Sequence, residues 1–169
     1  NTTFYQTVPL LLWYILLVVL LASFGYFLND CFDVKEDALV DKTNFASKFS
    51  PKIRILILIG LFIPAYFSWF YITDNHTVHL FLCIHAALLF LYSVPPFRVK
   101  NKGNWALLID SAYSLVIPIV VTFFYFSKSQ VDPNYPLVTE IAIWAFLLGL
   151  RNIIQHHIVD SNKDKISGT

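Results

Sequence analysis

The feature that most limits the fold of this chain is a series of five apolar runs, each close to the length of a membrane-spanning helix. A helix needs about 20 mostly apolar residues to cross the hydrocarbon core of a bilayer, and 57% of this chain is hydrophobic while 14% is charged. These runs predict an all-α fold, a polytopic transmembrane helix bundle, in one domain over residues 1–169 with loops at 29–50 and 156–169. The runs are Phe4–Leu28, Ile55–Ile72, Val78–Val94, Trp105–Phe126 and Leu137–Ile154.

Basic residues gather on one side of the topology that these runs predict. If the runs cross the membrane in succession, residues 29–54, 95–104 and those from 155 lie on one side, and residues 73–77 and 127–136 lie on the other. Eleven of the twelve Lys and Arg residues fall on or near the first side, and only Lys128 falls opposite. Because an excess of Lys and Arg marks cytoplasmic loops, we expect an integral, multi-pass membrane protein with the first side in the cytoplasm.

Two acidic clusters follow directly on apolar runs, and both fall on the predicted cytoplasmic side. Within each cluster the spacing is close to i, i+3 or i+4, and i+7, which places the members on one stripe of a helix. Polar stripes beside hydrocarbon are expected to face the interior of the bundle, because unpaired polar groups in lipid are costly. The first stripe comprises Ser23, Tyr26, Asp30, Asp33 and Asp37, next to Asn29, and the second comprises Asn152, Gln155, His156, Asp160 and Asp164.

The chemistry of these clusters favours magnesium. Carboxylate and amide oxygens are hard ligands, and Mg²⁺ typically binds a few carboxylates together with substrate phosphates. We therefore predict a Mg²⁺ site that holds a diphosphate and in which the five aspartates are essential for catalysis. Two alternatives are that the clusters are solvated loop charges, or that His156 and His157 bind zinc without a cysteine partner. The predicted metal ligands are Asn29, Asp30, Asp33, Asp37, Asp160 and Asp164.

Cations follow the third apolar run. The segment from Tyr92 to Lys102 ends a helix with a proline pair and then offers Arg98, Lys100 and Lys102. These cations either hold the outer phosphate of a diphosphate or anchor the chain at the membrane interface. Lys42 and Lys48 allow the same two interpretations. In the fourth run, Asp110 either lines a cavity or pairs with a loop lysine.

The two clusters and the Tyr92 segment together resemble the UbiA superfamily of intramembrane prenyltransferases. The family pattern Asn-Asp-x-x-Asp-x-x-x-Asp is matched by residues 29–37, and its second pattern, Asp-x-x-x-Asp, is matched by residues 160–164. The stretch from Tyr92 to Lys100 is similar to the family's cytoplasmic loop between the two motifs. The resemblance implies about nine membrane helices, of which this chain, a fragment of a longer protein, supplies about five.

The resemblance also implies a reaction. Mg²⁺ bridges the acidic motifs to a prenyl diphosphate, the prenyl tail lies in the apolar bundle, and a hydrophobic acceptor is alkylated. Tyr26, Phe27 and Tyr92 are expected to line the pocket of the allylic cation. The expected partners are these two substrates and membrane lipids, with no nucleic acid. Two other function classes remain open, a membrane cation transporter and a non-catalytic membrane scaffold. The residues expected to bind substrate are Asn29, Lys42, Tyr92, Arg98, Lys100, Asn152, Gln155 and His156.

Overall fold

A computed structural model describes residues 2–127 and 134–167 of the chain as helices and turns, with no strand among them. The side chains of residues 2–7, 156, 157 and 159–167 lie outside this description. Among the described residues, five helical segments are long and apolar enough to cross a membrane, which confirms the prediction of an all-α bundle with about five membrane-spanning helices. These segments are Val8–Leu39, Pro51–Ile72, His76–Ser93, Asn104–Phe126 and Tyr135–Gln155.

Packing divides the chain into two compact units, whereas the apolar runs by themselves predict a single domain. The first unit comprises Asn1–Val34 and Asn44–Ile72, and the second comprises Lys35–Thr43 and Thr73–Thr169. Helix α1, Thr2–Leu39, is continuous and passes from the first unit into the second.

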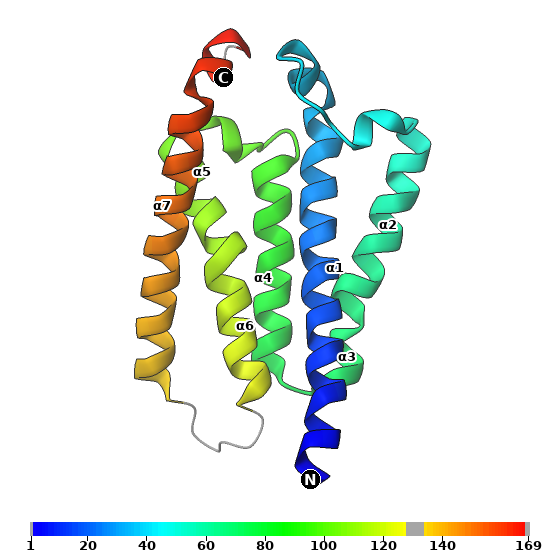
Figure 1. The fold of residues 1–169 in the computed structure, drawn as a ribbon, viewed down its shortest axis with the longest axis vertical. Coiled ribbons are helices and arrows are strands. Elements are labelled where there is room, and N and C mark those ends of the chain that lie inside the picture. The colour runs from blue at the N-terminus through cyan, green and yellow to red at the C-terminus, as the bar shows by residue number, and fades with distance from the viewer. Residues whose placement is uncertain (1, 128–133, 168–169) are drawn as a thin grey trace. The chain divides into compact units, whose positions relative to one another are not determined.

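Aromatic side chains hold the first unit together. Here α1 runs beside α2, Pro51–Phe67, and α3, Trp69–Ile72, and the short helix η1, Ala46–Lys48, lies in the connection (Figure 1). The ring of Phe24 is 5.3 Å from that of Phe62 and 5.7 Å from that of Tyr66. Nearer the start of α1, the fully buried Trp69 packs edge-on against Tyr14. Between membrane helices such packing replaces the hydrophobic driving force that lipid removes.

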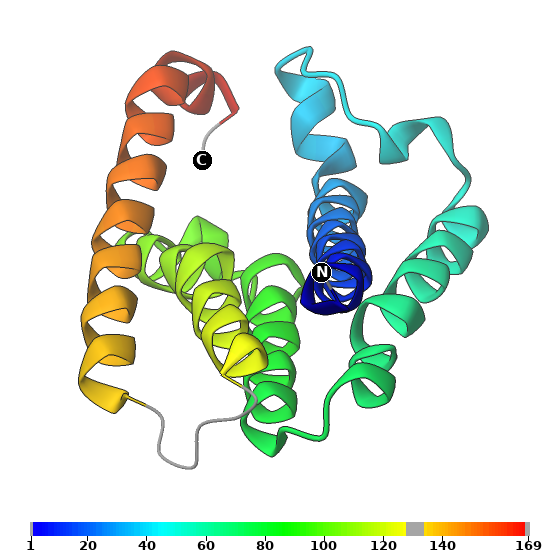
Figure 2. The ribbon, with the colours of Figure 1, turned by 60° about the horizontal axis from the view of Figure 1, so that its bottom comes forward.

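The second unit is built from four helical regions besides the end of α1. The first region is α4, His76–Ser93, and the second is the short helix η2, Val99–Asn101. The third is a continuous segment made of α5, Asn104–Ser111, η3, Ala112–Val116, and α6, Ile117–Phe126. The fourth is α7, Tyr135–Ser167. Figure 2 shows α7 lying along the α5–η3–α6 region, which in turn lies beside α4. Asn75 joins two of these helices, because it caps α4 by accepting from the Thr77 amide at 2.9 Å and donates to the Phe124 carbonyl at 3.2 Å.

Small residues allow α7 to approach α5 closely. Ala145 and Gly149 are four residues apart on α7, and Ala145 is fully buried. A Cβ atom at Gly149 would lie 2.9 Å from the Cα atom of Ser111, which is itself fully buried on α5. The Ser111 hydroxyl donates to the Leu107 carbonyl of its own helix at 2.7 Å, so the contact leaves no polar hydrogen unsatisfied. This is the small-xxx-small arrangement that lets membrane helices touch backbone to backbone.

The fourth membrane-spanning segment is interrupted by a π turn, η3, which ends at Val116, two residues before Pro118. Proline has no amide hydrogen and its ring clashes with the carbonyl four residues earlier, here that of Ser114 within η3. A wider turn at this point relieves the clash, which is a common origin of irregular turns in long helices. The segment therefore changes helical register between Ser111 and Ile117.

Half of the first predicted loop, 29–50, and most of the second, 156–169, belong to helices. Residues 29–39 continue α1, and residues 156–167 continue α7. The polar sequence after Leu28 contains no Gly or Pro before α1 ends, so nothing in it breaks the helix. The helix closes at Asp41, whose φ of 53° is left-handed, and the Lys42 amide donates to the Asp37 carbonyl at 2.9 Å. This is the Schellman pattern of a helix C-terminus.

Candidate functional site

The first aspartate motif lies on the last turns of α1. Asn29, Asp30, Asp33 and Asp37 all belong to this one helix, and Asp33 and Asp37 are 6% and 8% exposed. The Asn29 amide nitrogen donates to Asp33 Oδ2 at 2.7 Å, one turn further along. Buried carboxylates of this kind require hydrogen-bonding or charged partners, because desolvation disfavours the ionised form. The first predicted stripe is only partly buried, since Tyr26, on the same face as Asp33, is 79% exposed.

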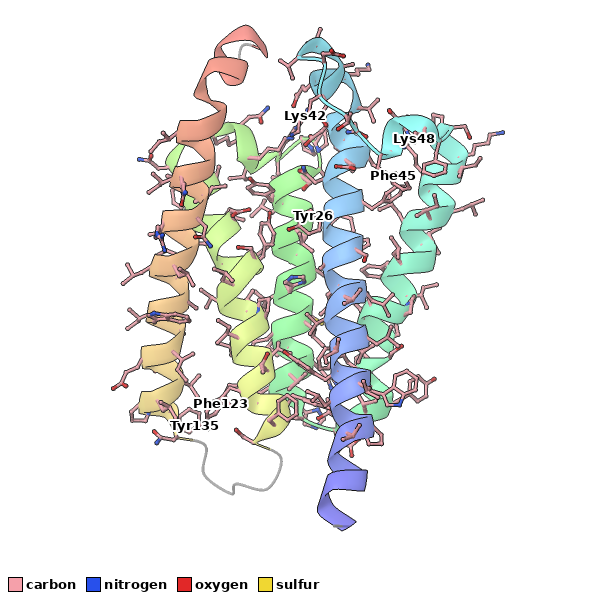
Figure 3. All side chains as sticks on the ribbon, in the orientation of Figure 1. Tyr26, Lys42, Phe45, Lys48, Phe123 and Tyr135 are labelled. Carbon is pink, nitrogen blue, oxygen red and sulfur yellow. The ribbon has the colours of Figure 1, made fainter. Side chains whose placement is uncertain are left out.

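The connection after α1 is tied back to the first motif by Asn44. This side chain is 7% exposed, and its amide nitrogen donates to the Asp30 carbonyl at 2.9 Å. Its other amide atom, Oδ1, accepts from the Ser47 amide at 3.1 Å. Just beyond, the Lys48 ammonium lies 5.3 Å from the centre of the Phe45 ring, where Figure 3 labels both residues. Lys48 therefore makes a cation–π contact at η1. The sequence indicates no role for Asn44, which lies outside both motifs.

Three cations that we expect to bind substrate gather at the end of α1 in the second unit. Arg98 Nη2 is 2.6 Å from Glu36 Oε2, and Lys100 Nζ is 3.7 Å from the same oxygen. Lys42, which Figure 3 labels just past the end of α1, has its Nζ 3.5 Å from Asp37 Oδ1. The structure therefore brings Lys42, Arg98 and Lys100 to the last turn of the first motif. The residue that gathers two of them, Glu36, is absent from the motif pattern.

The segment that carries Arg98 and Lys100 has a defined backbone. Arg98 adopts a left-handed conformation with φ of 37°, and its amide donates to the Val94 carbonyl at 3.0 Å. Such a conformation costs a residue with a side chain about 1–3 kcal/mol and persists where the surroundings impose it. The next residue, Val99, is 7% exposed and anchors the segment in the unit. Tyr92, in the last turn of α4, packs edge-on against Tyr113 with ring centres 5.2 Å apart.

The second aspartate motif lies on α7, which continues as a helix through residues 160 and 164. In the second unit, α7 extends toward the same end as the last turn of α1 (Figure 1). The side chains of His156, Asp160 and Asp164 lie outside the described residues. Asn152 and Gln155 are both exposed, which differs from the expectation that this stripe faces the bundle interior. The face of α7 that contacts α5 carries Ala145 and Gly149. Asn152 follows three residues after Gly149 on that stripe, and it is exposed nevertheless.

The donor atoms of the first motif suit a hard cation. The Asn29 side-chain carbonyl and the carboxylates of Asp30, Asp33 and Asp37 are all oxygen donors, as Mg²⁺ prefers. Among the residues whose side chains the structure describes, no group of three or more His, Cys, Asp or Glu side chains is close enough to hold a metal ion. The first motif therefore fits Mg²⁺ in chemistry, but a full set of ligands requires further oxygen donors.

The comparison with protein families shows to which family the chain belongs. No curated protein and no solved structure shows significant similarity to it. A family model described as the UbiA prenyltransferase family matches residues 2–169, a range that contains both aspartate motifs and the segment from Tyr92 to Lys100. The chain, an integral, multi-pass membrane protein with five apolar helices in the part that the structure describes, therefore belongs to the UbiA prenyltransferase family.

Proposed function

We propose that the protein transfers a prenyl group from a prenyl diphosphate to a hydrophobic acceptor within the membrane, in a reaction that depends on Mg²⁺. The observation that carries this proposal is the pair of buried carboxylates, Asp33 and Asp37, at the end of a membrane-spanning helix where Lys42, Arg98 and Lys100 gather. Carboxylates suit a divalent cation and the neighbouring cations suit an anionic leaving group. The apolar part of α1, which precedes these carboxylates, suits the prenyl tail.

In this proposal Asn29, Asp30, Asp33 and Asp37, together with Asp160 and Asp164, hold Mg²⁺. The metal, when bound, supplies positive charge to the oxygens of the diphosphate. Arg98 and Lys100 stabilise the negative charge that develops as the diphosphate leaves. Glu36 keeps both cations in place before substrate binds, because its carboxylate oxygen is within reach of each. The protein's own contribution is to position charge beside an apolar space, with the motifs on the cytoplasmic face.

Single substitutions in each motif test the proposal. In the full-length protein, Asp33→Ala and Asp160→Ala are expected to abolish Mg²⁺-dependent prenyl transfer while the protein still folds, since each removes a charged metal ligand. The assay combines radiolabelled prenyl diphosphates of several lengths with lipids extracted from the host, with and without EDTA. Asp74→Ala is a matched control, because Asp74 is an exposed acid in the connection before α4. Full turnover by both motif variants would exclude the assignment.

A further inference from the structure

An acid and a phenol form a hydrogen-bonded pair inside the fourth membrane-spanning segment. The Tyr113 hydroxyl donates to Asp110 Oδ1 at 2.7 Å, and both residues lie within Asn104–Phe126. Asp110 is six residues after the start of α5, which places it about 9 Å along the helix axis. The sequence suggests that Asp110 either lines a cavity or pairs with a loop lysine, and neither interpretation includes Tyr113. A carboxylate at such a depth is costly in lipid and usually serves a function.

Two ring side chains of α4 pack against Tyr113. The Tyr113 ring packs edge-on against Tyr92 of α4 at 5.2 Å, and against His85 of α4 at 6.3 Å. His85 is 6% exposed, so this is an interior position of the second unit. Tyr92 lies in the last turn of α4, which precedes the segment that carries Arg98 and Lys100. The pair therefore lies on the membrane side of the residues proposed to hold the diphosphate, at the depth where a prenyl tail would begin.

The local backbone sets Tyr113 apart from the regular helix. Tyr113 belongs to the π turn η3, whereas Asp110 belongs to the last turn of α5. π turns inside helices often occur at functional sites, because the inserted residue changes the direction of the following side chains. The close contact of Ser111 with Gly149 of α7 fixes the helix between Asp110 and Tyr113. The Asp110–Tyr113 pair is thus held between two rigid contacts, one to α4 and one to α7.

The proposed reaction needs a proton acceptor at this depth when the acceptor is alkylated on carbon. As the C–O bond of the prenyl diphosphate breaks, its electron pair leaves with the diphosphate. A π bond of the acceptor supplies the pair for the new C–C bond and leaves the acceptor positively charged. Loss of a proton from the alkylated carbon, or from the carbon beside the cationic centre, then restores the double bond. The proton must pass to a base, and carboxylates serve this role in general acid–base catalysis.

We propose that Asp110 is this base and that Tyr113 is the positioning residue that orients its carboxylate. The inference rests on the proposed function and adds the residue that takes the proton when the acceptor is alkylated on carbon. The Asp110 carboxylate receives the proton, and the Tyr113 hydroxyl orients this carboxylate by donating to Oδ1.

The test separates the two halves of the reaction in the full-length protein. Radiolabelled prenyl diphosphate and host lipid extract are supplied with Mg²⁺, and both the release of inorganic diphosphate and the transfer of label to lipid are measured. Asp110→Asn is expected to lower transfer by about 10²-fold or more, the usual contribution of a general base, while diphosphate release changes far less. The label then appears as prenyl alcohol, because water captures the cation. Glu140→Gln is the matched control, since Glu140 is an exposed acid near the start of α7.

Two further variants guard against a folding defect. Asp110→Glu keeps a carboxylate and is expected to recover part of the transfer, and Tyr113→Phe is expected to lower the ratio of transfer to release about tenfold. Equal loss of both halves in every Asp110 and Tyr113 variant would overturn the inference, because it would indicate a structural pair. Unchanged transfer would overturn it as well. If the wild-type protein performs neither half, the proposed function itself fails, and this inference fails with it.

Discussion

Glu36 binds two of the cations that the sequence predicts for substrate binding, although it lies outside the aspartate pattern. Its side chain is 29% exposed, and those of Arg98 and Lys100 are 21% and 13% exposed. Charges that are partly shielded from water interact more strongly than fully exposed ones, because water and salt screen them less. The ion pairs of Arg98 and Lys100 with Glu36 therefore connect the segment after α4 to the end of α1.

A double-mutant cycle measures the interaction between Glu36 and Arg98. Glu36→Gln and Arg98→Gln are each expected to lower the midpoint of thermal unfolding in detergent, and together to lower it by less than the sum, with a coupling of about 1 kcal/mol. The Asp37–Lys42 pair is the comparison, because its ions are 3.5 Å apart and Lys42 is 54% exposed. Its coupling is expected to be less than half as large. Strictly additive shifts for Glu36 and Arg98 would contradict the role given to their ion pair.

The motif residues could be predicted from the sequence, whereas their partners could not. The spacing of Asn29, Asp33 and Asp37 is a local helical pattern, and the hydrogen bond between Asn29 and Asp33 follows from it directly. The contact between Glu36 and Arg98 joins residues 62 positions apart, so no local pattern contains it. Asp110 and Tyr113 are only three residues apart, so their hydrogen bond could have been predicted from helical spacing.

Among the helices, the contact of α7 with α5 depends most on residue size. Gly149→Ala is expected to destabilise the protein by about 1–3 kcal/mol, because its Cβ would lie 2.9 Å from the Ser111 backbone. Gly60→Ala on α2 is the matched control, since a Cβ there meets nothing within 4 Å. That substitution is expected to stabilise the helix by about 0.5–1 kcal/mol, as alanine replaces glycine. Thermal unfolding of both variants in one detergent gives the comparison, and equal shifts would contradict the close contact.

Apolar runs predict the membrane-spanning part of a helix, but they do not predict its ends. The run that stops at Leu28 belongs to a helix that continues to Leu39, because helix formation depends on backbone hydrogen bonds and the absence of breakers rather than on hydrophobicity. Likewise α2 begins at Pro51, directly after an extended Ser50. Proline in the first turn is a standard start signal for a helix. This signal lay in the sequence, whereas the π turn at η3 reflects strain that hydropathy does not register.

For the whole molecule, the distribution of basic residues predicts which face lies in the cytoplasm. Lys102 and Asp74 are both exposed, in connections that follow and precede α4. In a variant with Cys31 and Cys83 replaced by serine, a membrane-impermeant maleimide applied to intact cells is expected to label Asp74→Cys and to spare Lys102→Cys. Permeabilised cells are expected to label both. Labelling of Lys102→Cys alone in intact cells would reverse the topology and place the motifs outside.

The length of α1 determines where its charged turns lie. At about 1.5 Å per residue, its 38 residues extend to about 57 Å, while the hydrocarbon layer is about 30 Å thick. The eleven residues from Asn29 to Leu39 alone account for about 16 Å of this rod. If α1 stands upright in the bilayer, its C-terminal end therefore reaches the level of the lipid headgroups. We expect a diphosphate to meet this end from the aqueous side while its prenyl chain stays dissolved below, so the substrate never has to leave the bilayer.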